Sequence, residues 1–281
     1  MNNLKIAVSP GALSPDLYEG IKLASELDVQ GLHIGAGGPW APEVLDTAGR
    51  KELLKLIRSY GLEVSALSRW GGEVHFELPE HREKALAEGR ATLEMAADME
   101  CGLWQAHIGV LPWETSDPDW ARIVDCAGQL AAIGEEVGAA LLIETGPEPP
   151  WVLKRLLEEV NSPALGINFD PANLIIWPVL LEKRGYGHTW SLEWADEHFN
   201  PQEGAKLLAP WVRHTHAKDA LVQDDGMYLE VPLGEGWVDW PQYIGNLQAG
   251  GFDGFYAIER EIKDPKLDTL NAVTFLRNLP V

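Results

Sequence analysis

The sequence alternates eight times between a short apolar segment and a longer amphipathic one. The apolar segments have near-continuous hydrophobic centres, which is typical of strands buried on both faces of a parallel sheet. The predicted strands span residues 5–10, 29–35, 62–68, 103–109, 140–146, 165–171, 211–219 and 254–261. The predicted helices follow them at about 14–27, 43–60, 81–100, 118–138, 151–160, 202–209, 239–249 and 267–277.

Start and stop signals support this alternation. Ser14 with Pro15 is a typical helix start, and Gly61 and Gly138 follow predicted helices as C-terminal glycines often do. Eight strand–helix units of roughly 35 residues predict an α/β protein, a (β/α)8 TIM barrel forming a single domain over residues 1–281. A doubly wound open sheet is the main alternative. Its dinucleotide-binding form is disfavoured because no GxGxxG follows the first strand.

The segment at about 174–200 interrupts the regular alternation of strands and helices, because it separates the sixth strand from its helix. It is too long for an ordinary βα connection, and in a barrel it would lie over the C-terminal face, where active sites form. Its tryptophans Trp177, Trp190 and Trp194 suit two uses, covering a substrate or burying a subunit interface, because pockets and interfaces both favour Trp. A homo-oligomer, either a dimer or a tetramer, therefore stays open as an expectation.

The amino-acid composition argues against two classes of binding partner. The chain has 22 basic and 43 acidic residues, for a net charge of −21. Nucleic acids and anionic membrane surfaces are bound through clustered Lys and Arg, so neither is expected as the main partner. Cys101 and Cys126 do not make a disulfide framework, and the N-terminus lacks the apolar core of a signal peptide. We therefore expect reduced thiols, a cytoplasmic location and no membrane span.

Four ionisable residues stand at the ends of the last four predicted strands: Glu144, Asp170, His216 and Glu259. Taken singly, each could be a helix cap, a salt-bridge partner or a hydrogen-bonded core residue. A buried carboxylate is costly unless it is paired or bound to a cation, and the C-terminal strand ends of a barrel converge on one site. Together the four residues predict a site for one divalent ion. Oxygen ligands with one nitrogen suit Mn²⁺ first, with Mg²⁺, Co²⁺ and Zn²⁺ as alternatives.

The segments around these residues resemble a known family. ETGPEP, INFDPANL, HTHAKDA, PLGEGWVDW and YAIERE occur in this order. They resemble the sugar phosphate isomerase/epimerase family of the xylose isomerase-like TIM-barrel superfamily. That superfamily also includes keto-sugar 3-epimerases, hydroxypyruvate isomerase, inosose dehydratase and AP-endonuclease IV. The resemblance covers nearly the whole chain and is strongest from residue 140 onward.

The resemblance implies that Glu144, Asp170, His216 and Glu259 are the metal ligands. It also implies that Glu144 and Glu259 flank the reacting carbon of a keto sugar or polyol derivative, one removing a proton next to the carbonyl and the other returning one. The implied enzyme is a metal-dependent isomerase or epimerase. A dehydratase or lyase acting on a keto sugar or keto-inositol is the alternative, because it begins with the same proton abstraction. A non-catalytic sugar-binding barrel is the third hypothesis.

The chain departs from the family's pattern at two places. Asn173 stands where many members carry a histidine, which counts against a 3-epimerase, although an amide could still hydrogen-bond a sugar hydroxyl. The segment after the seventh strand, LVQDDGMYLEVPLGEG, has no histidine. The three-metal cluster of the AP-endonucleases is therefore not expected, and with the net charge of −21 this argues against DNA repair.

Other side chains near the strand ends are candidates for the substrate pocket. The set predicted to contact a sugar is His107, Asn173, Lys218, Arg260, Trp70 and Trp113. Plain packing is the alternative for the aromatic residues, and an ion pair is the alternative for Lys218 and Arg260.

Two residues are predicted to lie behind the metal ligands. His214 precedes His216 by two residues, so both side chains point to the same face of the strand. Asp219 follows Lys218 and could pair with it. His33, at the end of the second predicted strand, suits a pocket contact and a packed core position equally well.

Overall fold

The computed structural model describes residues 2–71, 74–186, 189–260 and 265–281. Eight parallel strands close into a barrel in the order β1-β10-β7-β6-β5-β4-β3-β2, and β1 pairs with both β2 and β10. Closure excludes the open doubly wound sheet and confirms the predicted TIM barrel. The barrel strands are β1 Lys5–Val8, β2 Gly31–Gly35, β3 Glu63–Ser68, β4 Leu103–Ala106, β5 Ala140–Glu144, β6 Leu165–Phe169, β7 Val212–Ala217 and β10 Phe255–Ile258.

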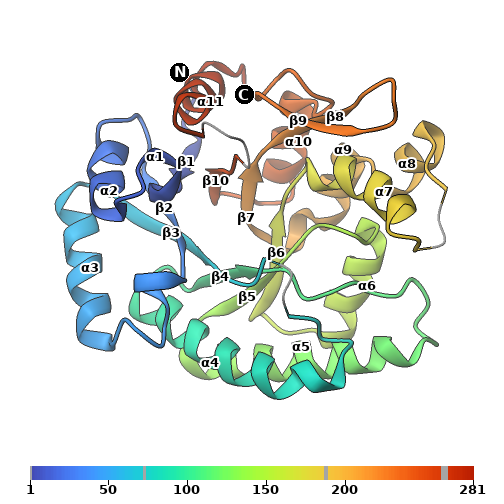
Figure 1. Cartoon of the computed structure of the whole chain (residues 1–281), viewed down its shortest axis with the longest axis horizontal. Coiled ribbons are helices and arrows are strands. Elements are labelled where there is room, and N and C mark those ends of the chain that lie inside the picture. The colour runs from blue at the N-terminus through green and yellow to red at the C-terminus, as the bar shows by residue number, and fades with distance from the viewer. Residues whose placement is uncertain (1, 72–73, 187–188, 261–264) are drawn as a thin grey trace.

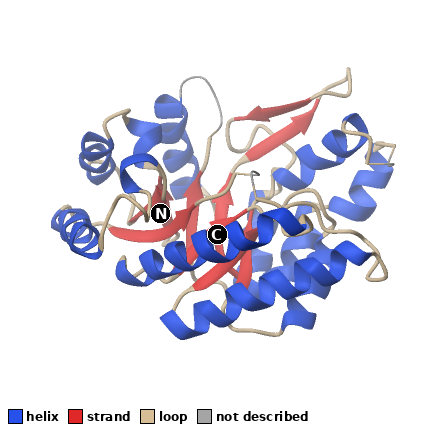
Figure 2. Cartoon of the chain, turned by 60° about the horizontal axis from the view of Figure 1, so that its bottom comes forward, coloured by secondary structure: helices blue, strands red, loops and turns tan. Residues whose placement is uncertain are grey.

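A ring of helices surrounds the barrel, as Figures 1 and 2 show. Each of the eight predicted helices is present. Asp46 and Asp117 cap the N-termini of two of them by accepting backbone N–H groups, and Gly138, at φ 78°, ends the helix that Asp117 begins. The helices are α2 Leu17–Ser25, α3 Thr47–Ser59, α4 Arg82–Asp98, α5 Pro118–Val137, α6 Pro150–Val160, α9 Pro201–Leu208, α10 Trp240–Ala249 and α11 Pro265–Asn278.

The segment at 174–200 is largely helical where the structure describes it. It contains α7 (Asn173–Lys183) and α8 (Leu192–Phe199), with Ser191 capping α8 at the N–H of Trp194. Short elements complete the chain: α1 Pro10–Leu13 and the 3-10 turns η1 Gly38–Trp40, η2 Pro79–His81 and η3 Ala209–Trp211.

The segment after β7 is a hairpin rather than the loop that the sequence suggested. β8 (Asp219–Val222) and β9 (Tyr228–Val231) pair antiparallel and stand apart from the barrel strands in Figure 2. The turn between them places Gly226 at φ 77°, a conformation that glycine adopts without strain. The hairpin carries Tyr228, Leu229 and Glu230 to the mouth of the barrel.

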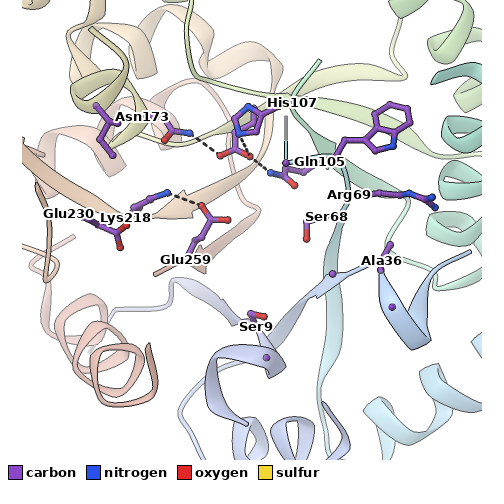
Figure 3. A pocket seen from close by; sticks show the side chains of 18 of the residues that line it. Ser9, Ala36, Ser68, Arg69, Gln105, His107, Asn173, Lys218, Glu230 and Glu259 are labelled. Carbon is purple, nitrogen blue, oxygen red and sulfur yellow. Dashed lines mark hydrogen bonds and ion pairs between the residues drawn. The ribbon is translucent and has the colours of Figure 1, made fainter. Parts of the chain in front are cut away.

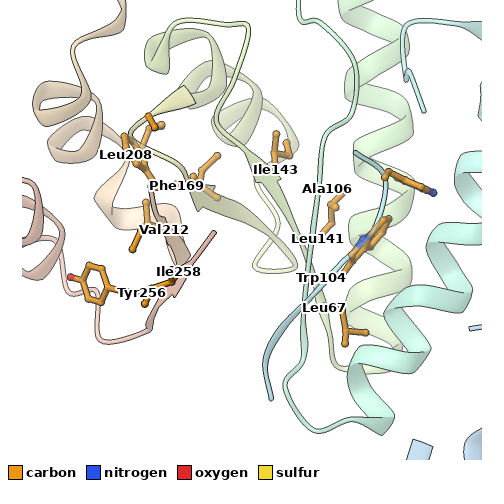
Figure 4. Packing of buried hydrophobic residues seen from close by; sticks show 14 of the residues in the cluster. Leu67, Trp104, Ala106, Leu141, Ile143, Phe169, Leu208, Val212, Tyr256 and Ile258 are labelled. Carbon is orange, nitrogen blue, oxygen red and sulfur yellow. The ribbon is translucent and has the colours of Figure 1, made fainter. Parts of the chain in front are cut away.

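The core lies between the strands and the helices. Side chains such as Trp104, Ile143 and Phe169 point outward from the strands and are almost fully buried under the helix layer (Figure 4). Burial on this face explains the continuous apolar runs, and it leaves the polar strand ends to face the inside of the barrel. Among the described residues, no helix is both long and apolar enough to cross a bilayer.

Candidate metal centre and active site

The four predicted strand-end residues come together at the C-terminal mouth of the barrel. One ligand atom from each of Glu144, Asp170, His216 and Glu259 lies within 4.8 Å of the others. His216 is central: its Nδ1 lies 3.4 Å from a Glu144 oxygen, 3.4 Å from Asp170 Oδ2 and 3.1 Å from Glu259 Oε2. Three carboxylate oxygens and one imidazole nitrogen at this spacing fit the donor set of a single divalent ion.

Local hydrogen bonds fix the direction of these ligands. Asp170 Oδ1 accepts the N–H groups of Ala172 at 2.8 Å and Asn173 at 3.1 Å. The other oxygen, Oδ2, therefore faces His216. The Asn173 side-chain amide donates to Glu144 Oε1 at 2.9 Å, and the Thr145 hydroxyl accepts the N–H of Asp170 at 2.7 Å. Supporting bonds of this kind orient ligands before a metal binds.

The electrostatics of the cluster favour a cation. Burial opposes the ionisation of Glu259, but His216 and Lys218 outweigh it and hold the pKa of Glu259 well below its usual value. Burial likewise opposes the ionisation of Glu144, while His107 and His216 lower its pKa. Burial also disfavours charge on His216, yet Glu259 and Glu144 raise its pKa well above the usual range. Glu144 and Glu259 are therefore ionised, and a divalent ion would replace the proton on His216.

Three buried histidines, His33, His214 and His216, contact one another with tilted or perpendicular rings. Burial first, and then neighbouring histidines, lower the pKa of His33 to about 4 and that of His214 well below its usual value, so both rings are uncharged. His214 is buried, and its two ring nitrogens lie 2.8 Å from Asn168 Oδ1 and 3.2 Å from Ser65 Oγ.

His33, His214 and His216 also form a group close enough to share a metal ion. His214 uses both of its nitrogens in hydrogen bonds, and His216 already faces the three carboxylates, so the carboxylate group is the better candidate for a metal site. His33 contacts His214 and His216 with ring centroids 5.0 Å and 5.1 Å away, as a packed core residue would.

The ligand cluster forms the floor of a cavity of about 1180 Å³. Glu144 and Glu259 reach the cavity, whereas Asp170 and His216 are fully buried below it. The predicted substrate contacts His107, Asn173, Lys218 and Trp70 line the wall. Figure 3 shows Asn173, Lys218 and Glu259 on one side, with Ser9, Ser68 and Ala36 across the space.

Lys218 and His107 flank the two glutamates. Lys218 Nζ lies 3.3 Å from Glu259 Oε2 and 3.8 Å from Asp170 Oδ2, and His107 Nε2 lies 3.5 Å from Glu144 Oε2. Each glutamate at the cavity therefore has one basic side chain beside it in addition to His216. Lys218 pairs with Glu259 rather than with Asp219.

Asp219 supports the loop that follows the hairpin. Its Oδ1 accepts the N–H groups of Ala220 and Val238, and its Oδ2 accepts those of Gly234 and Gly236 and the indole N–H of Trp240. The carboxylate thus organises the segment PLGEGWVDW. It stands next to the metal cluster in sequence but points away from it.

Replacing Asp219 by Asn should destabilise the fold by about 2 kcal/mol, because an amide group would face N–H donors that need an acceptor. Chemical denaturation would measure this. Asp224→Asn, an exposed change in the hairpin turn, is the matched control and should have little effect. Equal stability of both variants would contradict the role given to Asp219.

Two predicted substrate contacts do not reach the cavity. Arg260 is buried and pairs with Glu230, at 3.2 Å, and with Asp268, while its Nη1 donates to the carbonyl of Val231. Trp113 packs against Trp151, with ring centroids 5.7 Å apart. Neither is among the described residues that line the cavity. Their pairing and packing partners correct the expectation of a substrate contact for both.

Trp70 lies at the cavity but is held firmly in the wall. Its indole N–H donates to Glu88 Oε2 at 3.0 Å, and its ring meets Trp104 edge-on with centroids 4.7 Å apart. Only 3% of Trp70 is exposed, so it offers an edge rather than a full stacking face.

Gln105 was not among the predicted site residues, and Trp177 had two predicted uses. The amide of Gln105 donates to Glu144 Oε2, so Gln105 and Asn173 together hold that carboxylate. Gln105 precedes His107 by two residues, and this strand periodicity could have identified it. Trp177, on α7, lines the cavity, whereas Trp190 and Trp194 pack against the core.

Comparisons with known proteins agree with this fold. The sequence matches the family described as xylose isomerase-like TIM barrel over residues 21–279, and the chain belongs to that family. No curated protein matches the sequence.

Three solved structures illustrate the likeness. A xylose isomerase domain protein from Planctomyces limnophilus is 27% identical, with 98% of this chain and 95% of that chain covered and a TM-score of 0.78. A D-tagatose 3-epimerase-like protein is 19% identical, with 98% and 97% covered and a TM-score of 0.73. A probable 3-DHS dehydratase, AsbF from Bacillus anthracis, is 16% identical, with 98% and 99% covered and a TM-score of 0.74.

Proposed function

We propose that the protein is a divalent-metal-dependent sugar isomerase or epimerase, which transfers a proton next to the carbonyl of a keto sugar or polyol derivative. The observation that carries the proposal is that Glu144 and Glu259 face one cavity from different strands, beside the ligand atoms of Asp170 and His216. Solved structures of epimerase-like and dehydratase-like proteins share this fold, which agrees with an enzyme of this kind.

The residues present fit a metal ion, which Glu144, Asp170, His216 and Glu259 would hold. Their hard oxygen donors with one nitrogen suit Mn²⁺ first, and also Mg²⁺, Co²⁺ or Zn²⁺. When bound, such an ion supplies Lewis acidity that makes the proton next to a carbonyl easier to remove.

The two glutamates are suited to moving that proton. Both have a lowered pKa and are ionised, so either can act as a base. Gln105 and Asn173 fix Glu144 in one orientation, and Glu144 is 3% exposed. Glu259 is more accessible, with 28% of its side chain exposed, and lies beside the Lys218 ammonium. One glutamate would remove the proton and the other would return one to the opposite face.

The walls favour an uncharged substrate. Arg69 pairs with Glu43 and with Glu88, the latter at 3.4 Å, and Lys218 pairs with Glu259. Arg184 lies over the Trp177 ring at 4.7 Å. Because these basic groups already have partners, a phosphate would have to displace the partners in order to bind. The hydroxyl groups of an uncharged sugar would not have to.

Solvent exchange tests the proposal. The protein, loaded with Mn²⁺ in D₂O, should introduce deuterium at the carbon next to the carbonyl of a neutral keto sugar, with a new epimer or isomer visible by NMR. Exchange accompanied by an unsaturated product would assign the dehydratase or lyase chemistry instead. Tight sugar binding without exchange would assign a non-catalytic barrel.

A further inference from the structure

The cavity is larger than the metal centre requires. Its volume of about 1180 Å³ exceeds the range of roughly 300–1,000 Å³ typical of clefts that take up drug-sized ligands. It runs from the ligand cluster across the barrel mouth to the loops that follow β1 and β2 (Figure 3). A single sugar ring at the metal would leave the far part of this space unfilled.

The two parts of the cavity differ in chemistry. The metal half presents charged and amide groups, among them Gln105, Asn173 and Lys218. We call the other part the distal half; its lining residues are Ser9, Gly11, Gly35, Ala36, Gly37 and Trp40. Ser9 offers a hydroxyl group, the glycines offer backbone, and Trp40 offers the edge of its indole ring. None of these six residues has a charged side chain. Such a surface suits the hydroxyl groups and the apolar face of an uncharged sugar ring.

Gly37 borders open space in the distal half. Its backbone has φ −141° and ψ 171°, an extended conformation that any residue adopts. A Cβ added at Gly37 would meet nothing within 4 Å. Neither backbone strain nor packing therefore requires glycine at this position. A large side chain introduced at Gly37 would therefore extend into this open space.

We propose that the substrate is a two-ring keto glycoside, whose reacting ring lies at the metal and whose second, uncharged ring lies in the distal half. This inference rests on the proposed function for the reacting ring. Arg69, at the border of the two halves, is already paired with Glu43 and Glu88, so the second ring carries no phosphate.

The test compares two substrates with the same reacting ring, 3-keto-trehalose and 3-keto-glucose, by deuterium exchange with the Mn²⁺-loaded protein. The wild type should show kcat/KM at least tenfold higher for the two-ring substrate. Gly37→Trp, which fills the distal half, should reduce this ratio at least tenfold, and Gly37→Ala should reduce it less. Gly245→Trp is the matched control, because Gly245 is exposed on α10 with nothing within 4 Å of an added Cβ.

The outcomes separate this inference from the proposed function. Exchange that is equal on both substrates, with a ratio unchanged in Gly37→Trp, would overturn the two-ring inference and leave the isomerase or epimerase standing. If neither substrate exchanges, the proposed function is judged on other neutral keto sugars, and calorimetry with unreactive trehalose and glucose decides the distal half. The two-ring inference is supported if the protein binds trehalose more tightly than glucose and if Gly37→Trp weakens the binding of trehalose. Equal binding of the two sugars, or no binding, would overturn it.

Discussion

The Glu144→Gln/Glu259→Gln double variant is expected to purify without the divalent ion and to lose solvent exchange by at least about 10³-fold. Both changes keep the size of the side chain but remove two of the three carboxylates whose oxygens converge with His216 Nδ1. A hard cation then keeps only one anionic ligand. Elemental analysis of protein purified without added metal should find about one ion per wild-type chain and almost none per variant chain.

Controls make this result specific. Glu235→Gln removes an exposed carboxylate in the segment between β9 and α10 and should leave metal content and exchange unchanged. Circular dichroism should show that the double variant is folded. If the wild type, refolded or incubated with Mn²⁺, Mg²⁺, Co²⁺ or Zn²⁺, takes up no ion, the metal assignment fails. Glu144, Asp170, His216 and Glu259 would then be a structural polar network.

The convergence of Glu144, Asp170, His216 and Glu259 could be predicted from sequence because it depends only on strand order and strand ends. In a closed parallel barrel the C-terminal ends meet at one mouth, so a carboxylate directly after an apolar strand core has few other places to point. Glu144, Asp170 and Glu259 meet this condition, and His216 lies in register within β7. No knowledge of loop conformation was needed.

Residues one position away from this pattern were harder to place. Arg260 follows Glu259 and Asp219 follows Lys218, and successive side chains of an extended segment point to opposite sides. Arg260 therefore turns to Asp268 and Glu230, and Asp219 turns to the loop at 234–240. Applying the strand periodicity strictly would have excluded both from the metal centre.

Residues on loops could not be placed from sequence at all. Trp113 follows β4 in a connection without periodicity, so nothing in the sequence indicates that it packs on Trp151 rather than over the cavity. The distal half was missed for the same reason. It is built by short segments after β1 and β2 that contribute mainly glycine and small residues, and such residues carry no chemical signal until the space in front of them is seen.

The second large effect is expected at Glu148, a buried carboxyl group in the segment between β5 and α6. Glu148 is 1% exposed, and within the described part of the chain its Oε2 has no hydrogen-bond partner. Burial, with a smaller contribution from Glu77, raises the pKa of Glu148 to about 8, although a backbone hydrogen bond with Leu111 opposes the shift. The folded protein therefore keeps a proton on Glu148 at pH values where an unfolded chain has lost it.

This shift predicts how stability depends on pH. Between the unfolded-state pKa of 4.5 and the folded-state pKa of about 8, the folded state binds more protons than the unfolded state. The free energy of unfolding must then fall as pH rises through this window, and the fall ends above about pH 8. Glu148→Gln, which stays neutral throughout, should remove this contribution. Relative to the variant, the wild type should lose roughly 3 kcal/mol of stability between pH 5 and pH 8.

Chemical denaturation of both proteins at pH 5, 6.5 and 8 measures this difference, because the titration of all other groups cancels when the two curves are subtracted. Glu83→Gln, an exposed change on α4, is the control and should give a curve parallel to that of the wild type. Parallel curves for Glu148→Gln as well would show that Glu148 is ionised in the folded protein. The buried carboxyl would then need a cationic partner that its surroundings in the described chain do not provide.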